Sequence, residues 1–291
     1  MINTMEELNH PRHNFLIILD SNLKYQSLSL ILNLKESQCY PGRIYVLYVF
    51  DSDSDKSEYA SLISRLLEFT SENLERDSLD VDVIYISKQE SELVTSKFIL
   101  SENTRITATT FLRLTLSRWL PKNLSQVLYL DIDILIKNCL KNLFELKHEA
   151  ILCAVRGGSV ELSLGKHLDD FNSLYFNAGV LLIDLKEWLA SNIESEISAI
   201  GHVRNYPLMD QDILNLTLKD RWHEIEKKYN FQQMYDPIVQ LRADVQSAII
   251  IHYVGVKPWH ESPATILVNQ YRLQFNKIRK LYPELVDKEE S

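Results

Sequence analysis

Short apolar runs alternate with stretches of helical periodicity along the first half of this 291-residue chain. A continuous apolar run is typical of a strand buried on both faces, and an alternating run is typical of a half-exposed strand. The predicted strands are residues 15–19, 43–50, 79–86 and 127–136, and the predicted helices are residues 25–34, 57–74 and 107–120. This order predicts an α/β protein with an open, mostly parallel sheet and right-handed crossovers. Ligands of such sheets bind beyond the carboxyl ends of the strands.

The second half of the chain has a less regular pattern. The predicted strands are residues 150–155, 176–184 and 247–253, and the predicted helices are residues 185–200, 209–215 and 265–291. Residues 156–175 hold two adjacent glycines and many polar side chains, which indicates an ordered loop or lid. No repeat, low-complexity segment or linker interrupts the chain, so we expect one domain over residues 1–291, with a core at 14–260 and a helical tail at 261–291.

The run at residues 127–136 is interrupted by two carboxylates, Asp131 and Asp133. An isolated carboxylate in a buried strand costs several kcal/mol or more, so both acids need a compensating charge. Side chains at positions i and i+2 of an extended chain point to the same face, so the two acids can converge on one cation. Carboxylate oxygens are hard ligands that suit Mg²⁺ or Mn²⁺. The alternative is a pair of acids that cap the strand end and accept hydrogen bonds from backbone N–H groups.

Composition and charge narrow the classes of function. The chain is 45% hydrophobic and 24% charged, as in an ordinary soluble globular protein. Its net charge of -9 argues against a nucleic-acid-binding protein, whose affinity depends on a basic surface. The three cysteines are scattered without the spacing of a zinc site, so we interpret them as reduced thiols of a cytoplasmic protein. The N-terminal segment has no signal-peptide pattern, and no apolar run approaches the ~20 residues of a membrane span.

A second group of candidate residues lies at the end of the last predicted strand and directly after it. His252 ends an apolar run, where a histidine is more commonly a satisfied core residue than a ligand. Gly255 would let the backbone approach a ligand, and Lys257 offers a positive charge to a phosphate. Two carboxylates and an imidazole around one cation, with a lysine beside it, form the surroundings that a diphosphate leaving group needs. The chain has neither the glycine pattern of a dinucleotide-binding Rossmann fold nor a P-loop.

Acid-rich segments lie at or directly before the starts of two of the predicted helices. The segment at 51–55 resembles a calcium loop only in its alternate acids, and we interpret it as a solvated turn and helix N-cap. Asp210, Gln211 and Asp212 open a short helix, where the macrodipole favours acids, and N-capping would explain one or two of them. Asn177 lies at the mouth of a predicted strand and is as compatible with a turn as with a ligand contact.

Four sequence blocks together resemble the signature of glycosyltransferase family 8, which includes bacterial lipooligosaccharide α-galactosyltransferases and glycogenin. The blocks are Tyr129-Leu130-Asp131-Ile132-Asp133, Phe176-Asn177-Ala178-Gly179-Val180, Asp210-Gln211-Asp212-Ile213-Leu214-Asn215, and His252-Tyr253-Val254-Gly255 with Lys257-Pro258-Trp259. They occur in the family's order, and the resemblance extends over most of residues 15–259. A single block is weak support for the resemblance, whereas four blocks in the family's order are specific to that family.

The resemblance implies a GT-A fold, with a single mixed, mostly parallel sheet flanked by helices and a nucleotide-sugar site at the carboxyl ends of the strands. It implies a retaining transferase that moves a hexose, galactose or glucose, from a UDP-sugar to a glycan or glycolipid acceptor, with Mn²⁺ or alternatively Mg²⁺ as cofactor. By motif match the metal ligands are Asp131, Asp133 and His252. The matched donor-binding positions are Asp20, Asn22, Arg113, Asp131, Ile132, Asn177, Ala178, Gly255 and Lys257, and the matched catalytic positions beside the sugar are Asp210 and Gln211.

Two departures from the family pattern affect the donor site. The family has an aromatic residue that stacks on uracil three positions after its first-loop aspartate. This chain has Leu23 there, so the stacking passes to Tyr25 or is absent. Only Val256 separates Gly255 from Lys257, where the family has two residues, and this affects the reach of the lysine to the diphosphate.

Two other classes of function remain as alternatives. A phosphatase of the haloacid dehalogenase type also places an Asp-x-Asp pair at a strand end, although that pair usually lies near the N-terminus. A non-catalytic module that binds a UDP-sugar would keep the same fold.

The expected setting of a transferase is the synthesis of lipopolysaccharide or another cell-surface glycan in the cytoplasm. The acidic C-terminal residues speak against a membrane anchor, although Arg279 and Lys280 are compatible with a weak peripheral contact at the inner membrane face.

Overall fold

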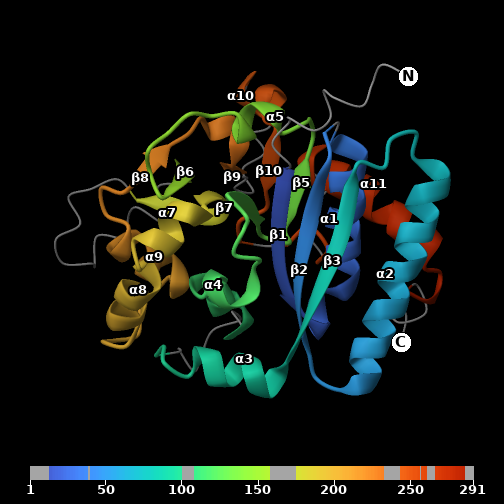
Figure 1. Cartoon of the computed structure of the whole chain (residues 1–291). Coiled ribbons are helices and arrows are strands. Elements are labelled where there is room, and N and C mark those ends of the chain that lie inside the picture. The colour runs from blue at the N-terminus through green and yellow to red at the C-terminus, as the bar shows by residue number, and fades with distance from the viewer. Residues whose placement is uncertain are drawn as a thin grey trace, which may run out of the picture.

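The structure, a computed structural model, describes residues 13–38, 40–99, 108–157, 175–232, 243–255, 257–260 and 266–285 (Figure 1). The strands are β1 (His13–Asp20), β2 (Gly42–Phe50), β3 (Leu79–Ser87), β4 (Gln126–Leu130), β5 (Ile134–Ile136), β6 (Leu152–Arg156), β7 (Phe176–Asp184), β8 (Trp222–Glu224), β9 (Phe231–Gln232) and β10 (Ile250–His252). The α-helices are α1 (Lys24–Ser37), α2 (Asp53–Asn73), α3 (Lys88–Thr95), α4 (Leu116–Trp119), α5 (Lys141–Phe144), α7 (Leu185–Ala190), α8 (Ile193–Gly201), α9 (Asp210–Thr217), α10 (Ala243–Ser247) and α11 (Ile266–Leu281). The 3-10 helices are η1 (Ser21–Leu23), η2 (Ala108–Leu114) and η3 (Lys227–Tyr229).

Seven strands form the main sheet, in the order β3-β2-β1-β4-β7-β6-β8. Strands β1 to β4 run parallel to one another, whereas β7 is antiparallel to both of its neighbours, β4 and β6. A separate three-stranded sheet has β10 at its centre, antiparallel to β5 and parallel to β9. The mixed, mostly parallel α/β sheet predicted from the sequence is therefore confirmed, and a small second sheet adds to it.

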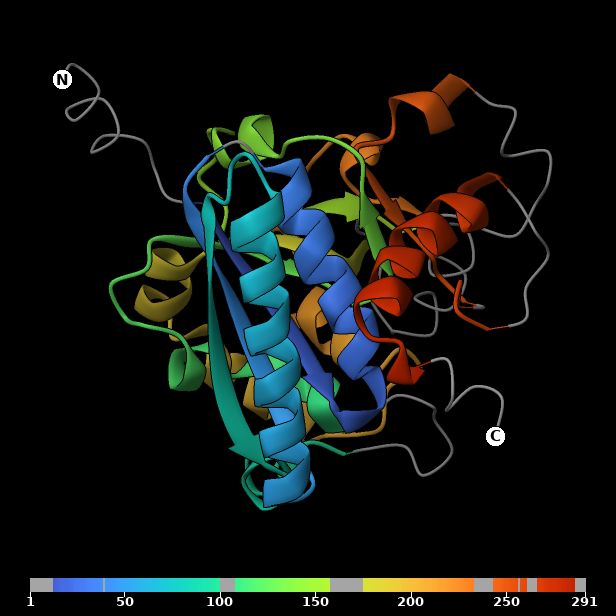
Figure 2. The same ribbon diagram turned by 90° about the vertical axis from the view of Figure 1, so that its right-hand side faces the viewer.

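Helices cover both faces of the main sheet. α1, α2 and α11 lie on one face (Figure 2), and α3, α4 and α7 to α9 lie on the other (Figure 1). Alternate residues of β1 face the two layers, with Phe15 and Ile17 packed in one apolar cluster and Leu16 and Ile18 in the other. Burial on both faces explains why β1 and β2 need continuous apolar runs. Within the described part of the chain, no helix combines the length and apolar character needed to traverse a bilayer.

The prediction of one strand over residues 127–136 is wrong. β4 ends at Leu130, and β5 begins at Ile134 in the other sheet, so the two acids lie in the link between the sheets. Asn33 of α1 anchors the far end of β5, because its side-chain amide exchanges hydrogen bonds of 2.7 and 3.0 Å with the backbone of Ile136. The apolar pattern does not reveal this break, since both segments are buried.

Two predicted helices are interrupted. The helix predicted at 107–120 is the 3-10 helix η2 followed by α4, and Thr115 lies between them with its hydroxyl donating to the carbonyl of Leu112 at 3.0 Å. Such a side-chain bond to the backbone competes with a regular helix. The helix predicted at 185–200 is split into α7 and α8, where Asn192 adopts a left-handed conformation with a φ of 53°.

The last predicted strand is shorter than expected. α10 ends at Ser247, so only the end of the segment predicted at 247–253 pairs in a sheet. The loop or lid predicted at 156–175 falls mostly outside the described residues, as do Val256 and the ends of the chain.

Candidate active site

The chain crosses from the main sheet to the small sheet at Asp131, Ile132 and Asp133. The backbone N–H of Asp131 donates to the carbonyl of Gly179 on β7 at 2.9 Å, which continues the ladder between β4 and β7. The backbone N–H of Tyr253, directly after β10, donates to the carbonyl of Asp133 at 2.9 Å. Ile132 between them is 6% exposed and packs in the core. Each acid is therefore held by a different sheet, and the meeting of the two sheets sets the spacing of the carboxylates.

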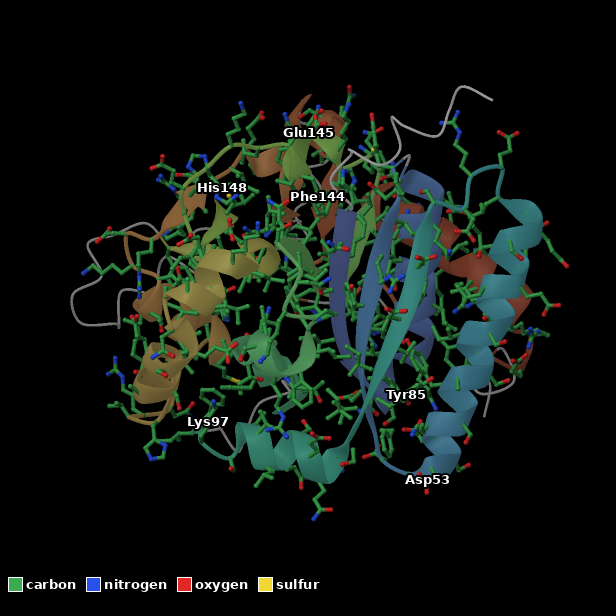
Figure 3. The ribbon with its side chains drawn as sticks, in the orientation of Figure 1. Asp53, Tyr85, Lys97, Phe144, Glu145 and His148 are labelled. Atoms are coloured by element: carbon green, nitrogen blue, oxygen red, sulfur yellow. The ribbon has the colours of Figure 1, made fainter. Side chains whose placement is uncertain are left out.

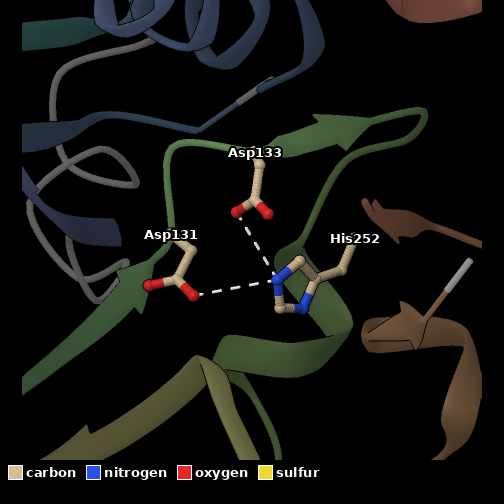
Figure 4. Close-up of side chains that lie close together, drawn as sticks. All are labelled: Asp131, Asp133 and His252. Carbon is tan, nitrogen blue, oxygen red and sulfur yellow. Dashed lines mark ion pairs between the residues drawn. The ribbon is translucent and has the colours of Figure 1, made fainter. Parts of the chain in front are cut away.

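Asp131, Asp133 and His252 converge at this junction (Figure 4). Nε2 of His252 lies 3.7 Å from Oδ2 of Asp131 and 3.5 Å from Oδ1 of Asp133. One ligand atom from each residue lies within 4.8 Å of the others. The structure thus brings together the three residues that the sequence nominated as ligands. Two carboxylate oxygens and one imidazole nitrogen form a donor set that fits Mn²⁺ or Mg²⁺.

The outer oxygen of each carboxylate already has a protein donor. Oδ1 of Asp131 accepts from the hydroxyl of Tyr129 at 2.6 Å and from Nη1 of Arg113 at 3.3 Å. Oδ2 of Asp133 accepts from Nζ of Lys257 at 2.5 Å. Each acid therefore turns its other oxygen toward the imidazole, and that oxygen is the atom available to a cation.

The charges of this cluster shift the pKa values of two of its members. Burial opposes ionisation of Asp133, but the positive charges of His252 and Lys257 outweigh it and hold the pKa of Asp133 well below 3.8. Burial favours the neutral form of His252, but Asp133 and Asp131 outweigh it and raise the pKa of His252 above 6.5. A proton and a divalent cation therefore compete for the same imidazole nitrogen.

Arg113 links the acid pair to the start of α9. It lies in η2, is 6% exposed, and donates from Nη1 to the carbonyl of Ala178 at 2.7 Å. Its Nε forms an ion pair with Oδ2 of Asp210, a residue that is 2% exposed. Burial raises the pKa of Asp210 to about 6, because Arg113 offsets only part of this effect and the charge of Asp131 adds to it.

The other polar residues at the start of α9 bond to the backbone and to one another. Oε1 of Gln211 accepts from a backbone N–H of β7 at 2.8 Å, and its Nε2 donates to the hydroxyl of Tyr175 at 3.1 Å. That hydroxyl donates to Oδ1 of Asp212 at 2.6 Å. Met209, directly before the helix, has a φ of 49°, a strained conformation for a residue with a side chain. Strain of this kind gathers at functional sites.

Asn177 and Ala178, which were predicted to bind the donor, lie on β7. The backbone N–H of Ala178 donates to Gln211 and its carbonyl accepts from Arg113, so this residue connects two candidate site residues. Asn177 is 4% exposed, and its Oδ1 accepts from the backbone N–H of Gly179 at 2.9 Å. Its side-chain oxygen therefore points into the protein.

Three of the residues predicted to bind the donor, Asp20, Asn22 and Tyr25, lie at the carboxyl end of β1, the strand beside β4, or directly after it, and Gly255 follows β10. Oδ1 of Asp20 accepts from the backbone N–H of Asn22 at 3.0 Å, and Asn22 is exposed. Tyr25 is half-buried, and its ring meets that of Tyr282 edge to face, with 6.3 Å between the centroids. Gly255 has a φ of 90°, and a Cβ built on it would meet no atom of the described residues within 4 Å.

Three residues with no predicted role also build this site. The hydroxyl of Tyr129 donates to Oδ1 of Asp131, and Oδ1 of Asn230 lies 3.0 Å from Nδ1 of His252. Gly179 leaves room for the imidazole, because a Cβ there would lie 2.2 Å from Cε1 of His252. The i, i+2 spacing of Tyr129 and Asp131 is a signal that could have identified the tyrosine. No local pattern marks Asn230, whose neighbours are aromatic residues.

Curated relatives of the chain are bacterial sugar transferases by name. The lipopolysaccharide 1,3-galactosyltransferase of Salmonella typhimurium is 30% identical over 184 residues, which cover 58% of this chain and 54% of that protein. The glycosyltransferase GlyB of Streptococcus pneumoniae is 26% identical over 240 residues, which cover 78% of this chain and 53% of that protein. The chain therefore spans about half the length of these two relatives.

A solved structure and a family model agree with these relatives. The galactosyltransferase LgtC, solved in complex with donor and acceptor sugar analogues, matches with a TM-score of 0.70 and 25% identity, over 91% of this chain and 95% of that chain. This match confirms the predicted GT-A fold. Residues 29–262 match the model of glycosyl transferase family 8, and this range contains all three members of the Asp131, Asp133 and His252 cluster. The chain therefore belongs to glycosyl transferase family 8.

Proposed function

We propose that this chain is a retaining hexosyltransferase that moves galactose or glucose from a UDP-sugar to a glycan acceptor and depends on Mn²⁺. The proposal rests above all on the convergence of Oδ2 of Asp131, Oδ1 of Asp133 and Nε2 of His252 on one point. Membership of the family and the printed names of the relatives support sugar transfer as the reaction.

Asp131, Asp133 and His252 would hold the divalent cation. When bound, the cation supplies Lewis-acid stabilisation of the negative charge that develops on the UDP leaving group. Tyr129 and Lys257 occupy the outer carboxylate oxygens, so each acid offers one oxygen. We favour Mn²⁺ over Mg²⁺ because Mg²⁺ prefers oxygen ligands, whereas an imidazole nitrogen suits a transition metal.

Lys257 would neutralise the diphosphate from the other side. Its Nζ reaches Asp133 at 2.5 Å, so the shortened link from Gly255 does not keep the lysine away from the centre of the site. Its compact charge would pair with phosphate oxygens. The described residues leave space beside Gly255, where a backbone can approach a ligand. Asp20, at the carboxyl end of β1, would bind the uridine end together with its neighbours in η1.

Retention would follow from attack on the face of the sugar that the leaving group occupies. A double displacement needs a free carboxylate nucleophile beside the sugar. Asp210 is tied to Arg113 in a buried ion pair, and Gln211 is an amide whose oxygen accepts from the backbone N–H of Ala178. The departing phosphate oxygen would then accept the proton of the acceptor hydroxyl, and Asp210 would hold sugar hydroxyls. A covalent glycosyl adduct at Asp210 would refute this part of the mechanism.

The proposed acceptor is a growing cell-surface glycan at the cytoplasmic side of the membrane. Curated relatives are named as lipopolysaccharide galactosyl- and glucosyltransferases, which supports an acceptor of this class. The last turn of α11 carries Arg279 and Lys280, which suit a weak contact with an anionic membrane surface.

The test is a UDP-release assay with UDP-galactose, UDP-glucose, UDP-N-acetylglucosamine and UDP-xylose, each with Mn²⁺ and with a chelator. We expect release from a galactosyl or glucosyl donor that needs Mn²⁺ and falls by about 10³-fold or more in Asp133→Asn, since the cation loses a charged ligand. No release from any donor would refute the proposal. UDP-sugar binding without turnover would favour a binding module, and hydrolysis of phosphomonoesters without UDP dependence would favour the phosphatase alternative.

A further inference from the structure

A series of amide groups holds the imidazole of His252 on the side away from the two carboxylates. The backbone N–H of Gly179 donates to Oδ1 of Asn177 at 2.9 Å. Nδ2 of Asn230 donates to the same oxygen at 2.8 Å. Oδ1 of Asn230 in turn lies 3.0 Å from Nδ1 of His252. All three side chains are buried, with Asn177 and His252 4% exposed and Asn230 0% exposed.

The donors and acceptors of this series can be arranged in one way. A backbone N–H only donates, so the atom of Asn177 that faces Gly179 is its oxygen. An amide oxygen only accepts, so Asn230 presents its NH₂ group to Asn177 and its own oxygen to His252. Nδ1 of the imidazole must then carry a hydrogen, and Nε2 of the neutral ring carries the lone pair. Nε2 is the atom that faces the two carboxylates.

We infer that Asn230 is a positioning residue that fixes His252 in the tautomer required of a metal ligand. This inference rests on the proposed metal centre. A histidine that binds metal usually donates its other ring N–H to a carboxylate or a carbonyl, and here a side-chain amide takes that place. A neutral acceptor is suitable because two carboxylates already face the imidazole.

The small sheet carries Asn230 to its position beside His252. Asn230 directly precedes β9, and β9 runs parallel to β10 with Gln232 opposite His252. Gly179 contributes twice, because its N–H starts the series and its lack of a side chain leaves space for the ring, which a Cβ would approach to 2.2 Å. This series of hydrogen bonds therefore joins β7 of the main sheet to β10 of the small sheet.

The alternative is that Asn230 contributes only packing and stability, as other buried asparagines do. Asn33 is such a residue, because it is 7% exposed and its amide exchanges two hydrogen bonds with the backbone of Ile136. Asn33→Ala is therefore the matched control for the loss of a buried amide.

The first test is the imidazole ¹⁵N spectrum of the metal-free wild-type protein at alkaline pH, where a histidine ring is neutral. We expect the resonances of His252 to show a protonated Nδ1 and an unprotonated Nε2. A protonated Nε2 would overturn the inference, and this measurement needs neither a variant nor activity.

The second test is a titration with Mn²⁺ in the presence of UDP, in which the electron paramagnetic resonance signal of the free ion is followed. Asn230→Ala is expected to bind Mn²⁺ about 10–100-fold more weakly and to lose the Nδ1-protonated form, whereas Asn33→Ala should change only the stability. An Asn230→Ala protein with the wild-type tautomer and affinity would overturn the inference.

If Asn230→Ala does not fold, the variant Asn230→Asp distinguishes a positioning role of Asn230 from a role in packing alone. Its carboxylate still accepts from Nδ1 but can no longer donate to Asn177. A positioning role predicts the wild-type tautomer and an affinity within about tenfold of wild type, in spite of lower stability. A change to the other tautomer would overturn the inference. If the wild-type chain binds no Mn²⁺ at all, the proposed metal centre itself fails. If it binds Mn²⁺ normally but His252 is protonated at Nε2, only the positioning role of Asn230 is refuted.

Discussion

Two helices of this protein, α2 and α9, begin with clusters of acids. The two clusters differ in burial, in partners and in the direction of their pKa shifts. The first turn of α2 holds Asp53 and Asp55, and the first turn of α9 holds Asp210 and Asp212. The helix macrodipole favours a negative charge at both places. From the sequence, a place at a helix start explains either cluster, but in the structure it explains only the first.

The acids of α2 stabilise the fold. The hydroxyl of Ser52 accepts from the backbone N–H of Asp55 and caps the helix, and Asp53 is exposed at the helix start (Figure 3). Asp55 forms an ion pair with Lys24 at 3.0 Å and accepts from the hydroxyl of Tyr48 at 2.6 Å. Burial opposes its ionisation, but these partners outweigh burial and lower the pKa of Asp55 below 3.8.

The acids of α9 belong to the candidate site. The residue before this helix, Met209, makes no side-chain cap, and Asp210 and Asp212 are 2% and 1% exposed. Burial raises the pKa of Asp210 to about 6 in spite of Arg113. The comparison shows that composition and position in a helix do not distinguish an acid that stabilises the fold from an acid of the candidate site. Burial and the partner that each acid meets make the difference.

Asp210→Asn should have the largest effect. An amide does not pair with the charge of Arg113 and is a weaker acceptor for a sugar hydroxyl, so we expect UDP release to fall by about 10²–10³-fold. Asp55→Asn, the matched change in α2, should leave UDP release within about twofold. Steady-state kinetics on both variants make the test, and equal losses would contradict the division between the two helices.

The two clusters should respond to pH with opposite signs. The pKa of Asp55 is lowered by folding, so its contribution to stability is present above about pH 4 and is lost as the pH falls. The pKa of Asp210 is raised from 3.8 to about 6, so the folded state gains up to about 3 kcal/mol as the pH falls from 6 to 3.8. Both signs refer to the wild-type chain relative to the Asn variant of the same residue.

Urea unfolding between about pH 3 and 7 measures this difference. As the pH falls, the wild-type protein should become more stable relative to Asp210→Asn and less stable relative to Asp55→Asn. The same sign for both pairs would show that the two acids have similar environments, contrary to the structure.

Asp212→Asn should have an intermediate effect. Asp212 accepts from the hydroxyl of Tyr175 at 2.6 Å and from the backbone N–H of Leu208 at 2.8 Å, and the same hydroxyl accepts from Gln211. We expect a loss of about 1–3 kcal/mol in the free energy of unfolding and a decrease of about tenfold in UDP release. Asp55→Asn should lose stability without the kinetic defect, and an Asp212→Asn enzyme with normal kinetics would assign Asp212 to capping alone.

Asp53→Ala should have the smallest effect. Asp53 is exposed in the first turn of α2, where it interacts with the helix dipole and with water. We expect a loss of a few tenths of a kcal/mol in the free energy of unfolding and unchanged UDP release. A kinetic defect in this variant would mean that the start of α2 contributes to the donor site.

Strands buried on both faces were predictable, because a continuous apolar run has few other uses in a soluble domain. β1, β2 and β7 lie where the pattern placed them. The break between β4 and β5 was not predictable, since a strand that changes sheets keeps the same apolar pattern. Interruptions such as the one at Asn192 depend on single residues whose conformation follows from tertiary contacts.

The candidate site likewise contains residues that could be identified from the sequence and residues that could not. Asp131 and Asp133 could be identified because carboxylates in an apolar run need a compensating charge. His252 became a candidate through Gly255 and Lys257, which follow it, and Asp210 became one only through the family resemblance. Tyr129, Gly179 and Asn230 act through other residues, and their roles depend on which atoms they meet. A neutral amide between two aromatic residues has no unusual chemistry of its own, so Asn230 is identified only from its contacts.

The sequence by itself determined the α/β class, the family and the identity of the three candidate ligands, because apolar periodicity and ionisable residues are local properties of a chain. Only the tertiary structure decided which carboxylate oxygen faces the imidazole, which ring nitrogen carries the lone pair, and which cluster of acids is buried. Those properties depend on hydrogen bonds between residues such as Asn177, Asn230 and His252, which meet because two sheets are packed side by side. Local patterns carry no information about such contacts, since their direction is set by atoms from distant parts of the chain.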